Sequence, residues 1–353
     1  MARALEGSAP GDPAASAASS APQQGSTQEA RVARASGQRV PDFFIVGHQK
    51  CGTTALYRML QEHPQIYMPV EKEPRFLIPE LRAKERNGRK PKRPTTFSEY
   101  LSLFEPAGPD RLTGEASPQY LRYEHIPATI AELAPSAKII ALLREPADFL
   151  RSFHGQMLHN RIETDKSFQK AMELEPARRR GERLPRDCNR PSWLLYSDHI
   201  RYAEQLRWFH GCFPPEQVLV LAYEDYRRDN EAVVRQVLRF LQVDDTVPVQ
   251  QVDTQPLKDV RFQPLHHLTA SMQEARRNPS AVGPAVRALD ALVPASARER
   301  FGAQWRSFIY RARVAPDASF VAALRRRFEP EVQAVSEYLG RDLIGLWGYD
   351  RLG

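Results

Sequence analysis

The chain has 353 residues, of which 42% are hydrophobic and 26% are charged, which is typical of a globular protein and excludes a wholly disordered chain. Its three cysteines exclude a disulfide scaffold, and its longest apolar runs of about six residues are far shorter than the roughly 18 of a membrane span. The formal net charge of +7 favours an anionic partner without identifying it.

Residues 1–39 contain almost no large apolar side chains and are rich in Ala, Ser, Gly, Gln and Pro. Such a segment is expected to be a disordered tail, because it has too little apolar surface to offset the entropy of ordering. It lacks the apolar stretch of a secretory signal, and Glu6, Asp12 and Glu29 argue against a transit peptide. We therefore expect a tail over 1–39, one domain over 40–353, and a cytoplasmic protein.

The domain is predicted to begin with a strand, a glycine turn and a helix. Residues 43–46 form a continuous apolar run, as in a strand that is buried on both faces. A turn follows over 47–52. Apolar residues then recur at helical spacing over 53–62, where Thr53 or Thr54 is a suitable N-cap.

Two more strand–helix units follow. The apolar run 138–143 predicts a strand, and Pro146 suits the first turn of the helix expected over 146–158. A third strand is expected over 217–222, with a helix over 226–241. This alternation predicts an α/β fold with a parallel sheet. Further helical segments are expected over 167–183, 198–209 and from about 262 to the end, most clearly 320–339.

The turn after the first strand has the features of an anion site. A glycine turn that opens a helix directs backbone N–H groups toward one point. Lys50 adds a positive charge, and Thr53 and Thr54 add hydroxyl donors, so the turn suits a phosphate.

The turn differs from the G-x-x-x-x-G-K-[ST] loop of nucleoside triphosphatases. The second glycine, Gly52, is followed by threonine, and Lys50 stands two residues before it. The strand 138–143 also ends in Arg144 and not in the aspartate that would help to hold Mg²⁺. We therefore expect protein cations, without a metal, to neutralise the phosphate.

Two segments resemble a known family. FIVGHQKCGTTAL resembles the 5′-phosphosulfate loop of sulfotransferases that use 3′-phosphoadenylyl sulfate (PAPS). LLREPADFLRSF resembles their 3′-phosphate segment, where an Arg follows a strand and a Ser comes eight residues later; here these are Arg144 and Ser152. MPVEKEPRFL is similar to a segment of bacterial and heparan-type members, and GEASPQYL and YLGRDLIGLW resemble family segments too.

The resemblance covers about 42–347 and implies the family's P-loop-like fold, a central parallel sheet flanked by helices with a helical C-terminal part. It implies a PAPS-dependent sulfotransferase acting on a hydroxyl or amine of a carbohydrate, lipid or natural product, without nucleic acid or a membrane span. Lys50 would stabilise the leaving phosphate oxygen, and Glu73 would be the general base. The residues that would bind the donor are Lys50, Cys51, Gly52, Thr53, Thr54, Arg144, Ser152 and Arg261.

Three positions depart from the family pattern. The family often has Arg where this chain has Phe149, so one phosphate contact is either missing or supplied by Arg151. Leu77 replaces a Phe, which we interpret as a packing change. Small-molecule members often use a His as base in another segment, but His154 follows Ser152 too closely to be assigned that role.

Several residues retain a purely structural alternative. Lys72 and Glu73 could form a solvated surface pair. Ser117 and Tyr120 either line the pocket or form a turn with Tyr120 half-buried. His48 is either a loop variant or catalytic, and Cys51 could be simply a small buried residue.

Two other functions also remain open. A basic run over 86–93 lacks the aromatic residues that stack on bases, which favours a solvated loop over a polyanion site. A non-catalytic polyanion-binding protein on the same fold is still an alternative. A Mg²⁺-dependent nucleotide kinase is another, disfavoured by the displaced lysine and the missing aspartate.

Overall fold

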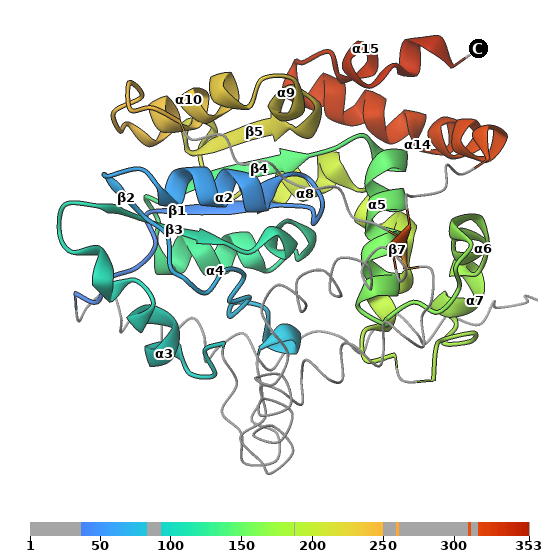
Figure 1. Ribbon diagram of the computed structural model, residues 1–353, viewed down its shortest axis with the longest axis horizontal. Helices are drawn as coiled ribbons and strands as arrows, with labels where there is room; N and C mark the ends of the chain where they lie inside the picture. The colour runs from blue at the N-terminus through green and yellow to red at the C-terminus, as the bar shows by residue number, and fades with distance from the viewer. Residues whose placement is uncertain are drawn as a thin grey trace, which may run out of the picture.

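The computed structural model describes residues 37–82, 93–186, 188–249, 259–260, 310–311 and 317–352. A five-stranded parallel sheet lies at its centre (Figure 1), with strands in the order β2-β3-β1-β4-β5. The strands are β1 (Phe43–Gly47), β2 (Ile66–Tyr67), β3 (Leu112–Ala116), β4 (Lys138–Leu143) and β5 (Val218–Ala222). The predicted α/β fold is therefore confirmed.

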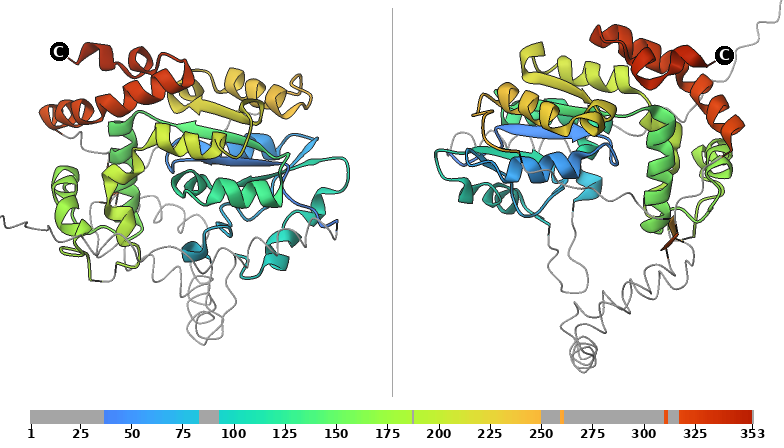
Figure 2. Two further views of the ribbon diagram at one scale, coloured as in Figure 1. Left: turned by 180° about the vertical axis from the view of Figure 1, so that it is seen from behind. Right: turned by 45° about the horizontal axis from the view of Figure 1, so that its top comes forward.

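Helices cover both faces of this sheet. Figures 1 and 2 show α2 and α10 on one face and α4 and α8 on the other. The helices are α2 (Thr53–Gln61), α3 (Phe97–Ser102), α4 (Ile126–Leu133), α5 (Pro146–His159), α6 (Phe168–Glu173), α7 (Glu175–Arg179), α8 (Tyr202–His210), α9 (Tyr223–Arg228), α10 (Asn230–Leu241), α14 (Ala318–Leu339) and α15 (Leu343–Trp347). Among these described helices, none has both the length and the apolar composition needed to cross a membrane.

Short segments complete the fold. A two-stranded antiparallel pair is formed by β6 (Asp259–Val260) and β7 (Tyr310–Arg311). The 3₁₀ helices are η1 (Pro79–Leu81), η2 (Glu105–Ala107), η3 (Pro118–Arg122), η4 (Pro191–Leu194), η5 (Tyr196–His199), η6 (Pro215–Gln217) and η7 (Tyr349–Arg351). Of these, η3 to η5 matter most here, because they flank the carboxyl ends of the strands.

The centre of the sheet is tightly packed around β1. All five residues of β1 are buried, and the strand pairs with β3 on one side and β4 on the other. Gly47, at the end of β1, has a φ of 134°, and a Cβ there would lie 2.4 Å from the carbonyl oxygen of Leu142. Only glycine therefore allows β1 to turn toward the loop while it still touches β4.

The predicted elements are largely confirmed, with differences at helix boundaries. The helix expected over 226–241 is instead α9 and α10, broken at Asp229, whose side chain accepts from the Ala232 amide at 2.9 Å and caps α10. The segment 167–183 forms two short helices, α6 and α7, and the helix expected from 198 begins at Tyr202 after a 3₁₀ turn. The strands β2 and β3 were not predicted.

Helices were expected from about residue 262 to the end, and 318–347 is largely helical, whereas Tyr310–Arg311 is a strand and 261–309 lies outside the described residues. The helical part is attached to the end of the sheet. Tyr349 donates its hydroxyl hydrogen to Glu145 Oε1 at 2.7 Å, and Trp347 Nε1 donates to Glu224 Oε2 at 2.7 Å. These bonds tie the last residues of the chain to the starts of α5 and α9. Residues 1–36 of the predicted tail and 86–92 of the basic run lie outside the described residues.

Candidate active site

The loop between β1 and α2 turns through two left-handed residues. Lys50 has a φ of 72° and Gly52 a φ of 86°. A Cβ at Gly52 would come within 3.2 Å of the Tyr223 ring, so the loop also needs glycine for space. The loop delivers the chain into α2, whose first turn provides N–H groups that the helix itself does not pair. The geometry is that of an anion-binding turn.

Arg144 follows β4 and is bound directly to this loop. Its Nη1 donates to the carbonyl oxygen of Lys50 at 2.9 Å, and its guanidinium lies 4.5 Å from the centre of the Tyr223 ring. Its Nε is buried and has no hydrogen-bond partner in the structure. The Arg144 side chain therefore lies against the backbone of the glycine loop at Lys50, at the carboxyl ends of β1 and β4.

The first turn of α5 is already capped by a carboxylate. Glu145 accepts hydrogen bonds from the amides of Ala147 at 3.2 Å and Asp148 at 2.6 Å. Because Glu145 already binds these amides, they are not available to an anion. An anion beside Arg144 would be bound by side chains instead. Ser152, the second residue of the expected 3′-phosphate pair, is buried on α5 two turns after Arg144.

The other loop residues have clear environments. Cys51 is fully buried, and burial raises the pKa of its thiol to about 12, which fits the small-buried-residue alternative. Thr53 is buried at the start of α2, whereas Thr54 is exposed. Arg261 lies outside the described residues, and its role stays a prediction.

Glu73 is held by three side chains. Lys72 Nζ donates to Oε1 at 2.8 Å, Arg75 Nη2 donates to Oε2, and Gln119 Nε2 donates to Oε2 at 3.2 Å. The Glu73 side chain is only 20% exposed, which does not fit a solvated surface pair. Burial alone would raise its pKa, but the charges of Lys72 and Arg75 outweigh burial and lower the pKa to about 2.

The backbone around Glu73 is equally constrained. Glu73 and Arg75 have φ values of 59° and 54°, which non-glycine residues seldom adopt. Three bonds compensate for this cost: Glu73 N donates to Ala116 O at 3.1 Å, Arg75 N to Ser117 Oγ at 3.0 Å, and Leu77 N to Tyr120 Oη at 3.2 Å. A strained segment held by neighbouring elements is typical of functional sites.

These bonds show what Ser117 and Tyr120, in the segment after β3, do in the structure. Ser117 and Tyr120 are fully buried, and their hydroxyl groups hold the Glu73 segment in place. The expectation of a half-buried Tyr120 is therefore wrong, since its side chain is fully buried and its ring centre lies 6.5 Å from that of Phe44. Neither residue lines the pocket described next.

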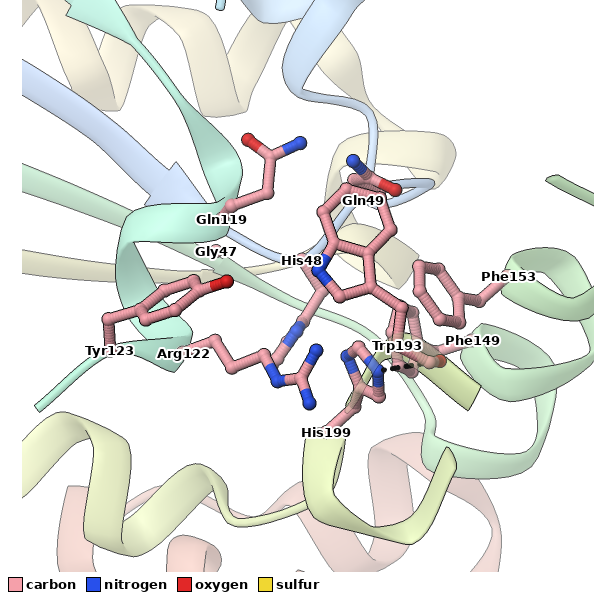
Figure 3. A pocket seen from close by; sticks show the side chains of 10 residues that line it. All are labelled: Gly47, His48, Gln49, Gln119, Arg122, Tyr123, Phe149, Phe153, Trp193 and His199. Atoms are coloured by element: carbon pink, nitrogen blue, oxygen red, sulfur yellow. Dashed lines mark hydrogen bonds between the residues drawn. The ribbon is translucent and has the colours of Figure 1, made fainter. Parts of the chain in front are cut away.

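A pocket of about 300 Å³, including the part open to solvent, lies beside the loop. Figure 3 shows its walls, which come from the β1 loop, η3, α5 and the 193–199 region. The lining residues are Gly47, His48, Gln49, Gln119, Arg122, Tyr123, Phe149, Phe153, Trp193 and His199. Gln119 lines this pocket and also donates a hydrogen bond to Glu73. His48 and Gln49 line the pocket and belong to the same loop as Lys50.

The two histidines considered in the sequence, His48 and His154, are held by hydrogen bonds and ring contacts. His48 Nε2 lies 3.1 Å from Gln205 Oε1, and its ring is tilted against that of Phe149 with centres 4.8 Å apart. Burial lowers the pKa of His48 to about 3, so its ring is neutral. His154 is bonded to the Asp165 carbonyl oxygen at 2.9 Å. The loop-variant interpretation of His48 fits this packing, and Phe149 supplies an aromatic wall where the family often has Arg.

Comparisons with known proteins identify the family of this chain. The family model described as "Sulfotransferase domain" matches residues 40–280, which is more than half of the chain. The chain belongs to the sulfotransferase family. The expected family resemblance is therefore confirmed.

Curated relatives lie in the heparan sulfate branch. The chain is 32% identical over 215 residues to the human bifunctional heparan sulfate N-deacetylase/N-sulfotransferase 3, which covers 58% of this chain and 22% of that protein. It is 28% identical over 137 residues to the mouse heparan sulfate glucosamine 3-O-sulfotransferase 5, covering 39% of this chain and 36% of that protein. The matched region thus spans about a fifth to a third of these relatives' length.

Among solved structures, the sulfotransferase from Alicyclobacillus acidocaldarius has the same architecture. It matches with a TM-score of 0.58 and 25% identity over 87% of this chain and 99% of that one. The parallel sheet and its flanking helices are therefore those of a sulfotransferase fold.

The sequence alone missed most of the pocket. Gln119 and Arg122 lie in or just after a segment noted for its resemblance, but no spacing pattern marks them as site residues. Trp193 and His199 stand more than 70 residues further along the chain, and only the fold brings them beside η3.

Proposed function

We propose that this protein is a PAPS-dependent sulfotransferase in which Glu73 is the general base and Lys50 meets the charge that develops on the leaving phosphate oxygen. The observation that carries this proposal is the bond between Arg144 Nη1 and the Lys50 carbonyl oxygen. It holds the Arg144 side chain against the glycine loop, which supports a donor site shared by the two.

The donor's two charged ends suit this site. The loop, Lys50 and the threonines at the start of α2 would hold the 5′-phosphosulfate. Arg144 and Ser152 would hold the 3′-phosphate, because the first amides of α5 are already bound by Glu145. The buried, unpartnered Nε of Arg144 fits an additional anionic acceptor of hydrogen bonds.

The chemical step needs a base and a cation on opposite sides of the transferred group. As the acceptor oxygen or nitrogen bonds to sulfur, the bond from sulfur to the phosphate oxygen breaks. Glu73 would take the acceptor's proton, which becomes acidic as the new bond forms, so that a carboxylate of low pKa suffices. Lys50 would stabilise the negative charge left on the phosphate oxygen.

The acceptor enters between these groups. Gln119 donates to Glu73 and also lines the pocket beside the loop. An acceptor bound in this pocket would therefore have Glu73 on one side and the loop on the other. We propose that the acceptor is a carbohydrate, a lipid or a natural product. The names of the curated relatives support a glycan acceptor.

The test is transfer of ³⁵S from labelled PAPS by the purified protein, with a panel of hydroxyl and amine acceptors. We expect transfer by the wild type and its loss in Lys50→Ala. Arg180→Ala is a matched control, because Arg180 pairs with Glu182 on the surface at 3.0 Å, away from the loop. A polyanion-binding protein would show no transfer and would keep its glycan binding in Glu73→Gln.

A further inference from the structure

The pocket beside the loop has an aromatic wall. Phe149 and Phe153 project from α5 with ring centres 5.5 Å apart, and Trp193 lies 6.3 Å from Phe153. All three rings are buried and line the pocket. A wall of this kind binds flat apolar groups through burial and ring stacking.

Arg122 is the cation of this pocket. In Figure 3 its guanidinium extends from η3 toward His48 and His199. Its Nη2 donates to the Ser192 carbonyl oxygen at 2.5 Å, whereas its Nη1 is buried and has no hydrogen-bond partner. A buried guanidinium nitrogen without an acceptor is costly, and a bound carboxylate would remove that cost.

No ion pair joins Arg122 to a carboxylate in the part of the chain that the structure describes. Asp198, whose charge acts on Arg122, is instead held by Arg179 through two bonds of 3.1 and 2.6 Å. The rings of His48 and His199 stay neutral because burial lowers the pKa of both. The pocket therefore has a net positive charge within aromatic surroundings.

Two further residues of the pocket wall have a buried polar atom without a partner. The Oε1 atoms of Gln49 and Gln119 are buried and have no donor in the structure. Both residues line the pocket, and Gln119 holds Glu73 through its other side-chain atom. A hydroxyl group at this end would donate to an amide oxygen and would lie beside the proposed base.

We propose that Arg122 determines acceptor specificity and that the acceptor is a small aromatic carboxylic acid bearing a hydroxyl group. Its carboxylate would bind Arg122, its ring would lie against Phe149, Phe153 and Trp193, and its hydroxyl would point to Gln119 and Glu73. A single ring that carries both polar groups is the smallest molecule that would use all of these features. This inference rests on the proposed function.

The experiment compares two phenols that differ only in charge, 4-hydroxyphenylacetate and 4-hydroxyphenylacetamide. Initial rates of ³⁵S transfer from PAPS give kcat/KM for each, and calorimetry gives the affinity of each for the complex with adenosine 3′,5′-bisphosphate (PAP). We expect the wild type to prefer the acid by about 10- to 100-fold, as for a charge-assisted hydrogen bond.

The variants assign this preference to one side chain. Arg122→Ala should reduce the preference to about 1 and leave PAP affinity unchanged, and Arg122→Lys should retain part of it. Arg122→Gln serves if the alanine variant fails to fold, since an amide can still donate to Ser192. Arg180→Ala, on the surface, should keep the full preference.

The outcomes separate the two proposals. Equal use of both phenols, transfer to neither, or a preference that survives in Arg122→Ala would overturn the Arg122 inference. PAP binding by the same protein would leave the proposed function standing in each of these cases. Failure of the wild type to bind PAP would overturn both.

Discussion

Glu73→Gln tests the proposed base with a nearly isosteric change. Glutamine keeps the shape and can still bond to neighbouring groups, but it cannot take a proton, and it removes the negative charge between Lys72 and Arg75. Loss of a general base lowers turnover by about two to four orders of magnitude. PAP affinity should change little, because the donor surface lies at the loop and Arg144.

The same change also costs stability, and its size follows from the pKa. The pKa falls from 4.5 to about 2, which corresponds to about 3 kcal/mol of stabilisation of the carboxylate at neutral pH. Because the folded-state pKa is depressed, this contribution is present above the unfolded pKa and is lost as the pH falls toward 2. Because glutamine is uncharged, Glu73→Gln is expected to lose stability of this order, about 3 kcal/mol.

The assay must therefore separate chemistry from folding. Turnover is measured well below the melting temperature, with PAP binding titrated on the same preparation. Glu71→Gln is the matched control: Glu71 lies two residues away, is 34% exposed, and approaches Arg93 at 3.8 Å. Turnover of Glu73→Gln within about tenfold of the wild type, with normal PAP binding, would refute the assignment of the base.

Three further results are expected. Because the pKa of Glu73 is about 2, kcat/KM should not fall between about pH 8 and pH 5 through protonation of this carboxylate. A fall of kcat/KM at acidic pH that is absent in Glu73→Gln would contradict this. Iodoacetamide at mildly alkaline pH should label exposed Cys212 and spare buried Cys51, whose pKa is raised to about 12; mass spectrometry of the folded protein checks this. Gly47→Ala should lower the melting temperature strongly or prevent folding, because its Cβ would lie 2.4 Å from Leu142 O; an unchanged melting temperature would be the contrary result.

The sequence predicts the elements whose residues follow one simple pattern. The strands β1 and β4 are continuous apolar runs, and their bounds are found within one residue. In contrast, β2 has only two residues, and β3 contains Gly114 and Glu115. Glu115 is buried inside the fold and accepts a bond from Tyr100 at 2.7 Å, so its environment depends on a partner that no local pattern shows.

The same distinction holds for the site. The glycine loop and Arg144 can be found because they follow predicted strands that end at the same edge of the sheet. The bond from Arg144 to the Lys50 carbonyl oxygen depends on side-chain packing against Tyr223, which sequence spacing does not specify. Arg122 is harder still, since its hydrogen-bond partner, the Ser192 carbonyl oxygen, lies 70 residues further along the chain.

Calorimetric titration of the folded wild-type protein with PAP tests the account most directly. The donor site proposed at the loop and Arg144 predicts saturable one-to-one binding that needs no divalent ion. Lys50→Ala and Arg144→Ala should each weaken it by about tenfold or more, as expected for losing a charge-assisted bond to phosphate, whereas Arg180→Ala should not. No detectable binding by the folded wild type, or equal binding by all four proteins, would contradict the account.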